Sequence, residues 1–224
     1  MIRLEEVRKT YRRADGSVFS ALDVPSLHVA AGEAVCVVGG SGTGKTTLLN
    51  VVAGIVRPDA GRVEVDGVDV TSLGEARRDL FRARRIGYVF QTFNLLQAYT
   101  AEENVLLPLR FAGVPRGEAR SRAAELLSRV GLGAKRAQKP AAMSVGEQQR
   151  VAVARAVACR PKVLLADEPT ASLDPANAAE AMRLLRDVAA EVGAVLLLVT
   201  HDQRLRGEFA RVETLGAARK EAAS

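Results

Sequence analysis

The sequence has no tryptophan, and aromatic residues make up only 4% of its 224 positions. Surfaces that stack nucleic-acid bases need exposed aromatic rings beside basic residues. The one dense basic stretch, Arg77-Arg78 with Arg82-Arg84-Arg85, lies on a helix predicted over 75–85. It is not expected to offer such rings, so no nucleic-acid partner is expected. Acidic residues are scattered among the other arginines, and the net charge is +6. This balance favours a solvated helix face over the alternative, a contact with lipid headgroups.

Cysteine is equally scarce, with only Cys36 and Cys159, and their positions fit neither a C-x-x-C motif nor a metal site. This excludes a disulfide framework and indicates reduced thiols in a cytosolic protein. The longest apolar run, Ala194 to Val199, is far short of the roughly 18 residues that a membrane-spanning helix needs. The N-terminal MIRLEEVRKTY lacks the apolar segment of a signal peptide. If the protein acts at a membrane, we expect another chain to cross it.

What the sequence does contain is a phosphate-binding loop, GGSGTGKT, between an apolar run and a helical pattern. Glycines let the backbone curl around a polyphosphate, and the following helix directs its positive end at the same point. The spacing G-x-x-x-x-G-K-[ST] places a lysine at the outer phosphates and a hydroxyl at Mg²⁺. The predicted ATP-binding residues here are Gly39, Gly40, Ser41, Gly42, Thr43, Gly44, Lys45, Thr46 and Thr47.

The rest of the chain alternates apolar strands with helical patterns, which predicts an α/β fold with a parallel core sheet. Residues 2–9 and 26–30 predict an N-terminal antiparallel β-subdomain, with a turn at 14–16. Helical patterns gather at about 92–160, which predicts an α-helical subdomain inserted into a core of 1–91 and 161–224. One of its helices is predicted to open at a capping box from Thr100 to Glu103. We therefore expect a single domain over 1–224, with no added domain in the final TLGAARKEAAS.

Polar residues follow several of the predicted strands. Gln91, the pair Asp167-Glu168 and His201 each come directly after an apolar run. Because such strand ends converge on one crevice in an open parallel sheet, we expect these side chains to meet the phosphate-binding loop. Asp167 suits a role at Mg²⁺, Glu168 suits polarisation of a water molecule, and His201 suits the γ-phosphate. Gln91 suits either the metal or the water.

Taken singly, each of these residues has a purely structural interpretation. A pair of carboxylates can cap a helix, and a lone histidine often serves structure alone. Tyr11, the only aromatic residue of the first fifteen, can stack on a nucleotide base or fill the edge of a strand.

Together these residues make the sequence resemble the ATP-binding cassette (ABC) ATPases, over essentially its whole length. The motifs are GGSGTGKT, the Q-loop Gln91, the signature MSVGEQQR, the Walker B stretch VLLADEP, the D-loop ASLD ending at Asp174, and the switch His201. The resemblance implies hydrolysis of ATP with Mg²⁺, in which Glu168, His201 and Gln91 are catalytic. It implies Mg²⁺ near Thr46, Gln91 and Asp167, and adenine stacked on Tyr11.

The resemblance also implies partners. Two cassettes would sandwich two ATP molecules, and the second ATPase subunit is either the same chain or a different one. Ser144 and Gly146 would then bind the γ-phosphate of the other copy's ATP, at a helix beginning near Glu147. Glu147 and Asp174 are also expected to bind ATP. A membrane permease subunit on a separate chain would dock near Gln91, which places the protein at the cytoplasmic face of the cell membrane as a peripheral subunit.

Two longer stretches, IGYVFQTFNLLQAYTAEENVLLPL and LLADEPTASLD, are similar to cassettes of the lipoprotein-release and macrolide-exporter type. They predict export, or transmission of force across the membrane. The alternatives are a soluble ABC ATPase, or a regulatory cassette that hydrolyses ATP weakly. The last is motivated by Val145, which replaces the first glycine of the family's signature. A β-branched residue is strained wherever the backbone requires a positive φ.

Overall fold

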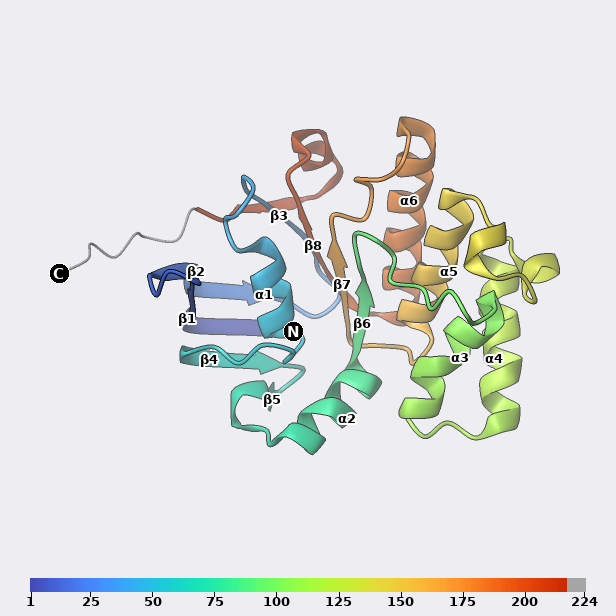
Figure 1. Ribbon diagram of the computed structural model, residues 1–224, viewed down its shortest axis with the longest axis horizontal. Coiled ribbons are helices and arrows are strands. Elements are labelled where there is room, and N and C mark those ends of the chain that lie inside the picture. The colour runs from blue at the N-terminus through green and yellow to red at the C-terminus, as the bar shows by residue number, and fades with distance from the viewer. Residues whose placement is uncertain (217–224) are drawn as a thin grey trace.

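The computed structural model describes residues 1–216 (Figure 1); the end of the closing stretch, 217–224, lies outside the described residues. The strands are β1 (Ile2–Arg12), β2 (Val18–Val29), β3 (Ala34–Val38), β4 (Ala60–Val65), β5 (Val68–Asp69), β6 (Ile86–Val89), β7 (Val163–Asp167), β8 (Val195–Thr200) and β9 (Arg211–Thr214). The helices are α1 (Lys45–Val52), α2 (Glu75–Arg85), α3 (Ala101–Phe111), α4 (Arg116–Arg129), α5 (Val145–Val157) and α6 (Pro175–Val192). Short 3₁₀ turns cover Val70–Ser72, Gly133–Lys135, Pro140–Ala142 and Gln203–Glu208.

The strands form two sheets, one parallel and one antiparallel, which confirms the predicted fold class. The parallel sheet has the order β6-β7-β8-β3-β9, and the antiparallel sheet has the order β2-β1-β4-β5. In the parallel sheet Val38 lies opposite Thr200, and Asp167 lies opposite Val199. The carboxyl ends of β3, β7 and β8 are therefore level, and the residues that follow them open onto one edge of the sheet.

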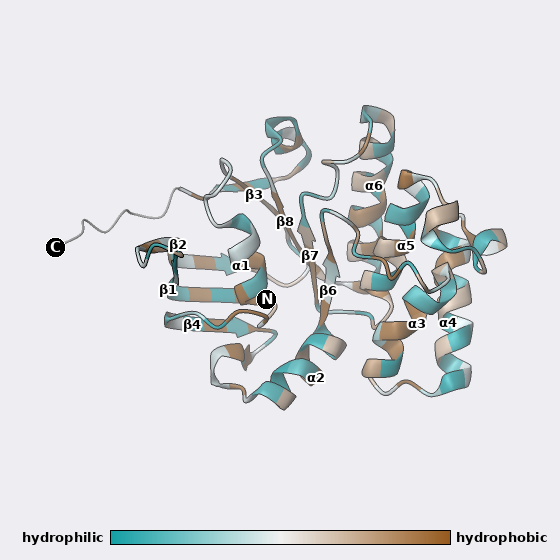
Figure 2. Cartoon of the chain, viewed as in Figure 1, coloured by the Kyte–Doolittle hydropathy of each residue, from teal (hydrophilic) through white to brown (hydrophobic). Residues whose placement is uncertain are grey.

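Helices cover both faces of the parallel sheet. Helix α1 lies between the antiparallel sheet and the parallel sheet, whereas α5 and α6 cover the opposite face (Figure 1). The central strands are brown along their length in Figure 2, as expected for parallel strands that are buried on both faces. Every residue of β7 and of β8 is buried. This continuous burial fixes the sheet edge at which the polar residues emerge.

Helices α3, α4 and α5 share a separate apolar core, beside the parallel sheet. The predicted capping box is present at the start of α3, where the Thr100 hydroxyl accepts from Glu103 N and the Glu103 carboxylate accepts from Thr100 N. Within residues 1–216, no helix combines the length and the apolar character needed to cross a bilayer.

Helix α2 has the bounds predicted from its basic pattern. Phe81 lies within the arginine-rich stretch, but its ring is 8% exposed and packs into the core below α1. Arg82 and Arg85 pair with Asp79 and Asp66. The helix therefore presents charges that are partly neutralised, and it presents no stacking ring, to solvent.

Three features of the fold differ from the prediction. Strands β1 and β2 extend well beyond 2–9 and 26–30, because their register continues from Ile2–Val29 to Arg12–Val18 through a shift at Lys9/Thr10. Strands β5 and β9 were not predicted, since both are short and their residues are only partly buried. Helix α5 begins at Val145 rather than near Glu147, because the Ser144 side chain caps it.

Candidate functional site

A cleft of about 620 Å³ opens where the loops after β3, β6, β7 and β8 meet the tips of β1 and β2. It brings together residues that are far apart in the sequence. Its lining consists of Tyr11, Phe19, Ala21, Ser41, Gly42, Gly44, Lys45, Thr46, Thr47, Gln91, Glu168 and His201. The structure thus places Tyr11, Gln91, Glu168 and His201 around the phosphate-binding loop, as the sequence predicts.

The phosphate-binding loop requires glycine at Gly44. Its φ is 92°, and a Cβ at this position would lie 2.0 Å from the Ala21 carbonyl oxygen of β2. Any side chain would therefore force the loop away from β2 and turn the first residues of α1 out of the cleft. With glycine at this position, α1 begins at Lys45 and directs its free N–H groups into the cleft. These groups form the positive end of the helix dipole.

Lys45 is only 8% exposed, and its ammonium group is held inside the loop. Lys45 Nζ donates to the carbonyl oxygens of Gly39 and Gly40, each at 3.0 Å. It also lies 3.6 Å from Glu168 Oε1. These contacts give Gly39 and Gly40 a role different from lining the cleft: they support the lysine. Thr43 likewise turns inward, donating from Oγ1 to the Gly40 carbonyl at 3.0 Å.

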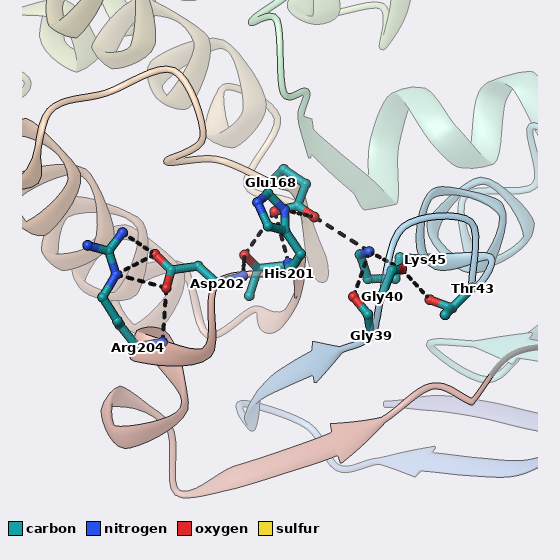
Figure 3. A network of polar contacts seen from close by, with 9 residues as sticks. Gly39, Gly40, Thr43, Lys45, Glu168, His201, Asp202 and Arg204 are labelled. Atoms are coloured by element: carbon teal, nitrogen blue, oxygen red, sulfur yellow. Dashed lines mark hydrogen bonds and ion pairs between the residues drawn. The ribbon is translucent and has the colours of Figure 1, made fainter.

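Glu168 lies between Lys45 and His201 (Figure 3). Its backbone is left-handed, with φ 45°, an unfavourable conformation that is common at functional sites. Glu168 Oε2 accepts from Thr200 Oγ1 at 2.8 Å and from His201 N at 3.1 Å. Glu168 Oε1 lies 2.9 Å from His201 Nδ1. The carboxylate is therefore held firmly, by two donors at Oε2 and by His201 and Lys45 at Oε1.

Asp167 is the neighbour of Glu168, and its carboxylate lies deeper. It is 6% exposed, and within residues 1–216 its Oδ1 atom is buried with no hydrogen-bond partner. Burial raises the pKa of Asp167, and a hydrogen bond with Thr46 opposes this shift. A carboxyl group beside Thr46, with one buried oxygen that lacks a donor within these residues, fits a cation with oxygen ligands, such as Mg²⁺. No three acidic, histidine or cysteine side chains gather into a metal cluster in the described chain, so phosphate oxygens and water would have to complete the set.

Tyr11 and Phe19 form an aromatic wall at the outer end of the cleft. They are partners across β1 and β2, with ring centroids 5.9 Å apart. Lys9 Nζ lies 5.5 Å from the centre of the Tyr11 ring. Sequence analysis found Tyr11 but missed Phe19 and Ala21, because β2 was predicted to begin only at residue 26. The register of the hairpin is the signal that would have revealed them.

Four further predicted residues, Ser144, Gly146, Glu147 and Asp174, lie outside this cleft, at the starts of α5 and α6. Ser144 caps α5 in a capping box with Glu147, whose carboxylate also contacts Lys135 Nζ at 2.5 Å. The bond from Lys135 lowers the pKa of Glu147. Asp174 caps α6 by accepting from the backbone N–H groups of Ala176 and Asn177.

The starts of α5 and α6 lie close together. A Cβ on Gly146 would lie 3.1 Å from Asn177 Oδ1, and the Asn177 amide in turn contacts Asp174. The four residues therefore form one surface, separate from the cleft that the chain builds by itself.

Val145 is not strained in this structure. It is the first residue of α5, its φ is not positive, and it is 47% exposed. The strain expected from a β-branched residue in the signature is therefore absent, because the Ser144 cap makes this position the first turn of a regular helix.

Comparison with known proteins places these features in context. The family model for ABC transporters matches residues 22–171. The chain is 43% identical to the lipoprotein-releasing system ATP-binding protein LolD of Chromohalobacter salexigens, over 98% of this chain and 92% of LolD. It is 44% identical to the methionine import ATP-binding protein MetN of Caulobacter vibrioides, over 98% of this chain but only 65% of MetN.

Solved structures agree with this likeness. The cassette MJ0796, in a dimeric post-hydrolysis state bound to ADP and phosphate, has a TM-score of 0.87 and 37% identity, over 96% of this chain and 94% of that one. A second dimeric structure of MJ0796, described as a bacterial ABC transporter cassette, has the same TM-score at 38% identity and the same coverage of both chains.

Proposed function

The chain belongs to the ABC transporter family, and from that premise we propose how its cleft binds and hydrolyses ATP. It is the ATP-binding, ATP-hydrolysing subunit of a membrane transporter complex, with ATP and Mg²⁺ as cofactors. One observation carries the proposed residue roles: five segments of the chain bring a side chain to one cleft, namely Tyr11, Lys45, Gln91, Glu168 and His201.

ATP binding follows from the two ends of the cleft. The adenine stacks on Tyr11 at the aromatic wall, and the phosphates lie on the N-terminus of α1 among Ser41, Gly42, Gly44 and Thr47. Lys45 leaves the carbonyl groups of the loop and binds the outer phosphates. There its ammonium group pairs with a charged oxygen instead of a neutral carbonyl.

Mg²⁺ fits beside the outer phosphates, where Thr46, Asp167 and Gln91 would hold it. When bound, the ion neutralises charge on the β- and γ-phosphate oxygens. Asp167 contributes a buried carboxylate oxygen that has no hydrogen-bond donor among residues 1–216. Gln91 reaches the cleft from the loop after β6, where it would orient a water or the ion.

Hydrolysis uses Glu168 as general base. Oε2 already accepts from two donors, so the proton of the attacking water goes to Oε1, which lies beside Lys45 Nζ and His201 Nδ1. ATP draws Lys45 away from Oε1 toward the phosphates, which leaves Oε1 to the water. The new O–P bond forms at the γ-phosphate as the bond to the ADP oxygen breaks, and His201 donates a hydrogen bond to the departing phosphate.

The second ATPase subunit completes this site. Ser144, Gly146, Glu147 and Asp174 lie on a surface apart from the cleft, so we propose that they bind the ATP of the partner copy. The Ser144 end of α5 offers N–H groups to a phosphate. Support comes from the dimeric structures of the similar cassette MJ0796.

A membrane permease on a separate chain receives the motion. We propose that it docks on an apolar groove of about 320 Å³ between α2, β6 and α3. Leu96 and Phe111 line this groove and are 44% and 73% exposed. The loop that carries Gln91 into the cleft continues to Leu96, so the groove and the cleft share one segment. We propose that residues 92–160 act as an inserted helical subdomain, with the protein at the cytoplasmic face of the membrane.

For the direction of transport we propose export or force transmission of the lipoprotein-release type. The support is the similarity to LolD, which extends over nearly the full length of both chains, together with the two stretches that resemble such cassettes.

The test is coexpression with a candidate four-span permease and purification from membranes. Wild type should copurify, and its ATPase rate should depend on the permease. Phe111→Asp should abolish copurification while ATP binding persists, whereas Ile55→Asp, at an exposed apolar residue after α1, should leave both intact. Copurification of both variants at wild-type levels would contradict the proposed docking groove.

A further inference from the structure

Arg155 forms hydrogen bonds with the loop that carries Gln91. From the last turn of α5 its Nη1 donates to the Asn94 carbonyl and its Nη2 donates to the Phe93 carbonyl, each at 2.6 Å. The planar guanidinium makes these bonds from two nitrogens in one rigid fork, whereas an ammonium group would have to make both from a single nitrogen. Because Phe93 and Asn94 follow Gln91 by only two and three positions, this fork acts directly on the segment that brings Gln91 into the cleft.

The part of the loop that Arg155 binds is held in an unfavourable backbone conformation. Phe93 and Asn94 both have left-handed backbones, with φ 58° and 47°. Two successive left-handed residues with side chains persist only where surrounding contacts determine them. The hydrogen bonds within the loop are short-range, with Phe93 N donating to the Phe90 carbonyl and Asn94 N to the Thr92 carbonyl. Arg155 supplies the long-range restraint from another element.

The surroundings of Arg155 disfavour the charged form of its guanidinium. Burial alone lowers the pKa of this guanidinium, to about 10. Its two described partners are neutral carbonyl groups rather than a carboxylate, and a charge that is partly buried without an opposite charge is unfavourable for stability. The Arg155 guanidinium lowers the stability of the fold and holds a strained loop. Its presence here is therefore better explained by a role at the loop than by packing.

Helix α5 is itself fixed against β6. A Cβ on Gly87 would lie 2.3 Å from the Ala156 carbonyl oxygen, so only glycine allows this approach of the helix to the strand. Arg155 directly precedes Ala156. The last turn of α5, strand β6 and the loop after it therefore form one connected unit, and the first turn of the same helix begins at Ser144.

We propose that Arg155 is a positioning residue for ATP hydrolysis, which holds residues 91–94 so that Gln91 stays in the cleft. It also connects Gln91 to the end of α5 that meets the partner copy, so that engagement of Ser144 is transmitted to the cleft. This inference rests on the proposed function. Without the fork, the loop relaxes from its left-handed conformation and withdraws Gln91, while Lys45 and the aromatic wall still bind ATP.

Steady-state kinetics of purified Arg155→Met, Gln91→Ala and the double variant test this role. Arg155→Met should lower kcat at least about tenfold, since small displacements of a catalytic group cost that much, with KM for ATP within about twofold of wild type. The double variant should be no slower than Gln91→Ala. Arg155→Lys should also lose activity, because it keeps the charge but not the fork. Arg129→Met, which breaks an exposed ion pair with Glu191, should behave as wild type.

Hydrogen exchange gives a second measurement. In Arg155→Met, the amides of residues 92–95 should exchange faster while those of β7 and β8 do not change. If the methionine variant fails to fold, Arg155→Lys serves in both measurements.

The inference is overturned if kcat is unchanged in the folded Arg155 variants, or if Gln91→Ala is itself fully active. It is also overturned if the fold reductions of kcat in the two single variants multiply in the double variant. The proposed function would fail in a different way, through a wild-type protein that does not hydrolyse ATP.

Discussion

The Thr200 hydroxyl donates a hydrogen bond to Glu168 Oε2 at 2.8 Å, and it is 1% exposed. Its direction is fixed, because Asp202 N donates to the same hydroxyl oxygen at 3.0 Å and leaves the hydroxyl hydrogen to the carboxylate. Glu168 is therefore oriented from behind by β8, and its other oxygen is turned toward the cleft and the phosphate-binding loop.

Replacing Thr200 with valine should slow hydrolysis without weakening ATP binding. Valine fills the same space but leaves Glu168 Oε2 with one donor fewer, and an unmet buried hydrogen bond costs about 1–3 kcal/mol. We expect a matching fall in kcat with little change in KM, measured by steady-state phosphate release. Thr200→Ser should restore the rate. A valine variant as fast as wild type would show that Glu168 does not need this donor.

Glu168→Gln should retain ATP and nearly abolish turnover. The amide keeps the size of the side chain but cannot accept the proton of the attacking water, and loss of a general base costs about 10²- to 10⁴-fold in rate. ATP affinity by equilibrium titration and turnover by phosphate release separate the two effects. Turnover within about tenfold of wild type would assign the base to another group.

Tyr11→Ala should weaken ATP binding and leave the chemical step intact. Stacking of a base on an aromatic ring contributes about 1–3 kcal/mol, which corresponds to a rise of about 5- to 150-fold in KM. Tyr11→Phe keeps the ring and should keep the affinity. An unchanged KM in Tyr11→Ala, with Phe19 still in place, would mean that the adenine lies elsewhere.

Val145→Gly should leave ATP turnover unchanged. Since Val145 already lies in a regular first helical turn, glycine relieves no strain; it lowers the free energy of unfolding by roughly 0.4 kcal/mol through its poorer helix propensity. Turnover and thermal unfolding of Val145→Gly and Val145→Ala check this. A rise in turnover in the glycine variant alone would show that the paired cassettes require a left-handed backbone at this position.

Much of the site could be predicted from the sequence, because each motif combines a local pattern with a fixed place in an α/β sheet. The glycine loop, the residues at the strand ends and the Thr100 cap depend on neighbours in sequence, and the structure places them as expected. Helix α2 was predicted at its observed bounds because its basic pattern begins after Gly74 and ends where the buried strand β6 begins.

What the sequence did not reveal depends on contacts between distant segments. Phe19 enters the cleft only through its register with Tyr11. In the sequence, Thr200 is only one more β-branched residue of a buried strand, because its contact with Glu168 forms only in the folded chain. Arg155 is one arginine among many, and its role depends on a loop 61 and 62 positions earlier in the chain. Strand β9 is only partly buried, and its partner β3 is distant in sequence.

ATP binding by Lys45→Ala tests the central claim most directly, namely that the phosphates of ATP bind at the start of α1. Hydrogen bonds to charged groups contribute about 1.5–3 kcal/mol, so the dissociation constant for ATP should rise at least about tenfold. Lys139→Ala, at an exposed lysine before α5, should bind as wild type does. ATP affinity unchanged in a folded Lys45→Ala protein would contradict the account.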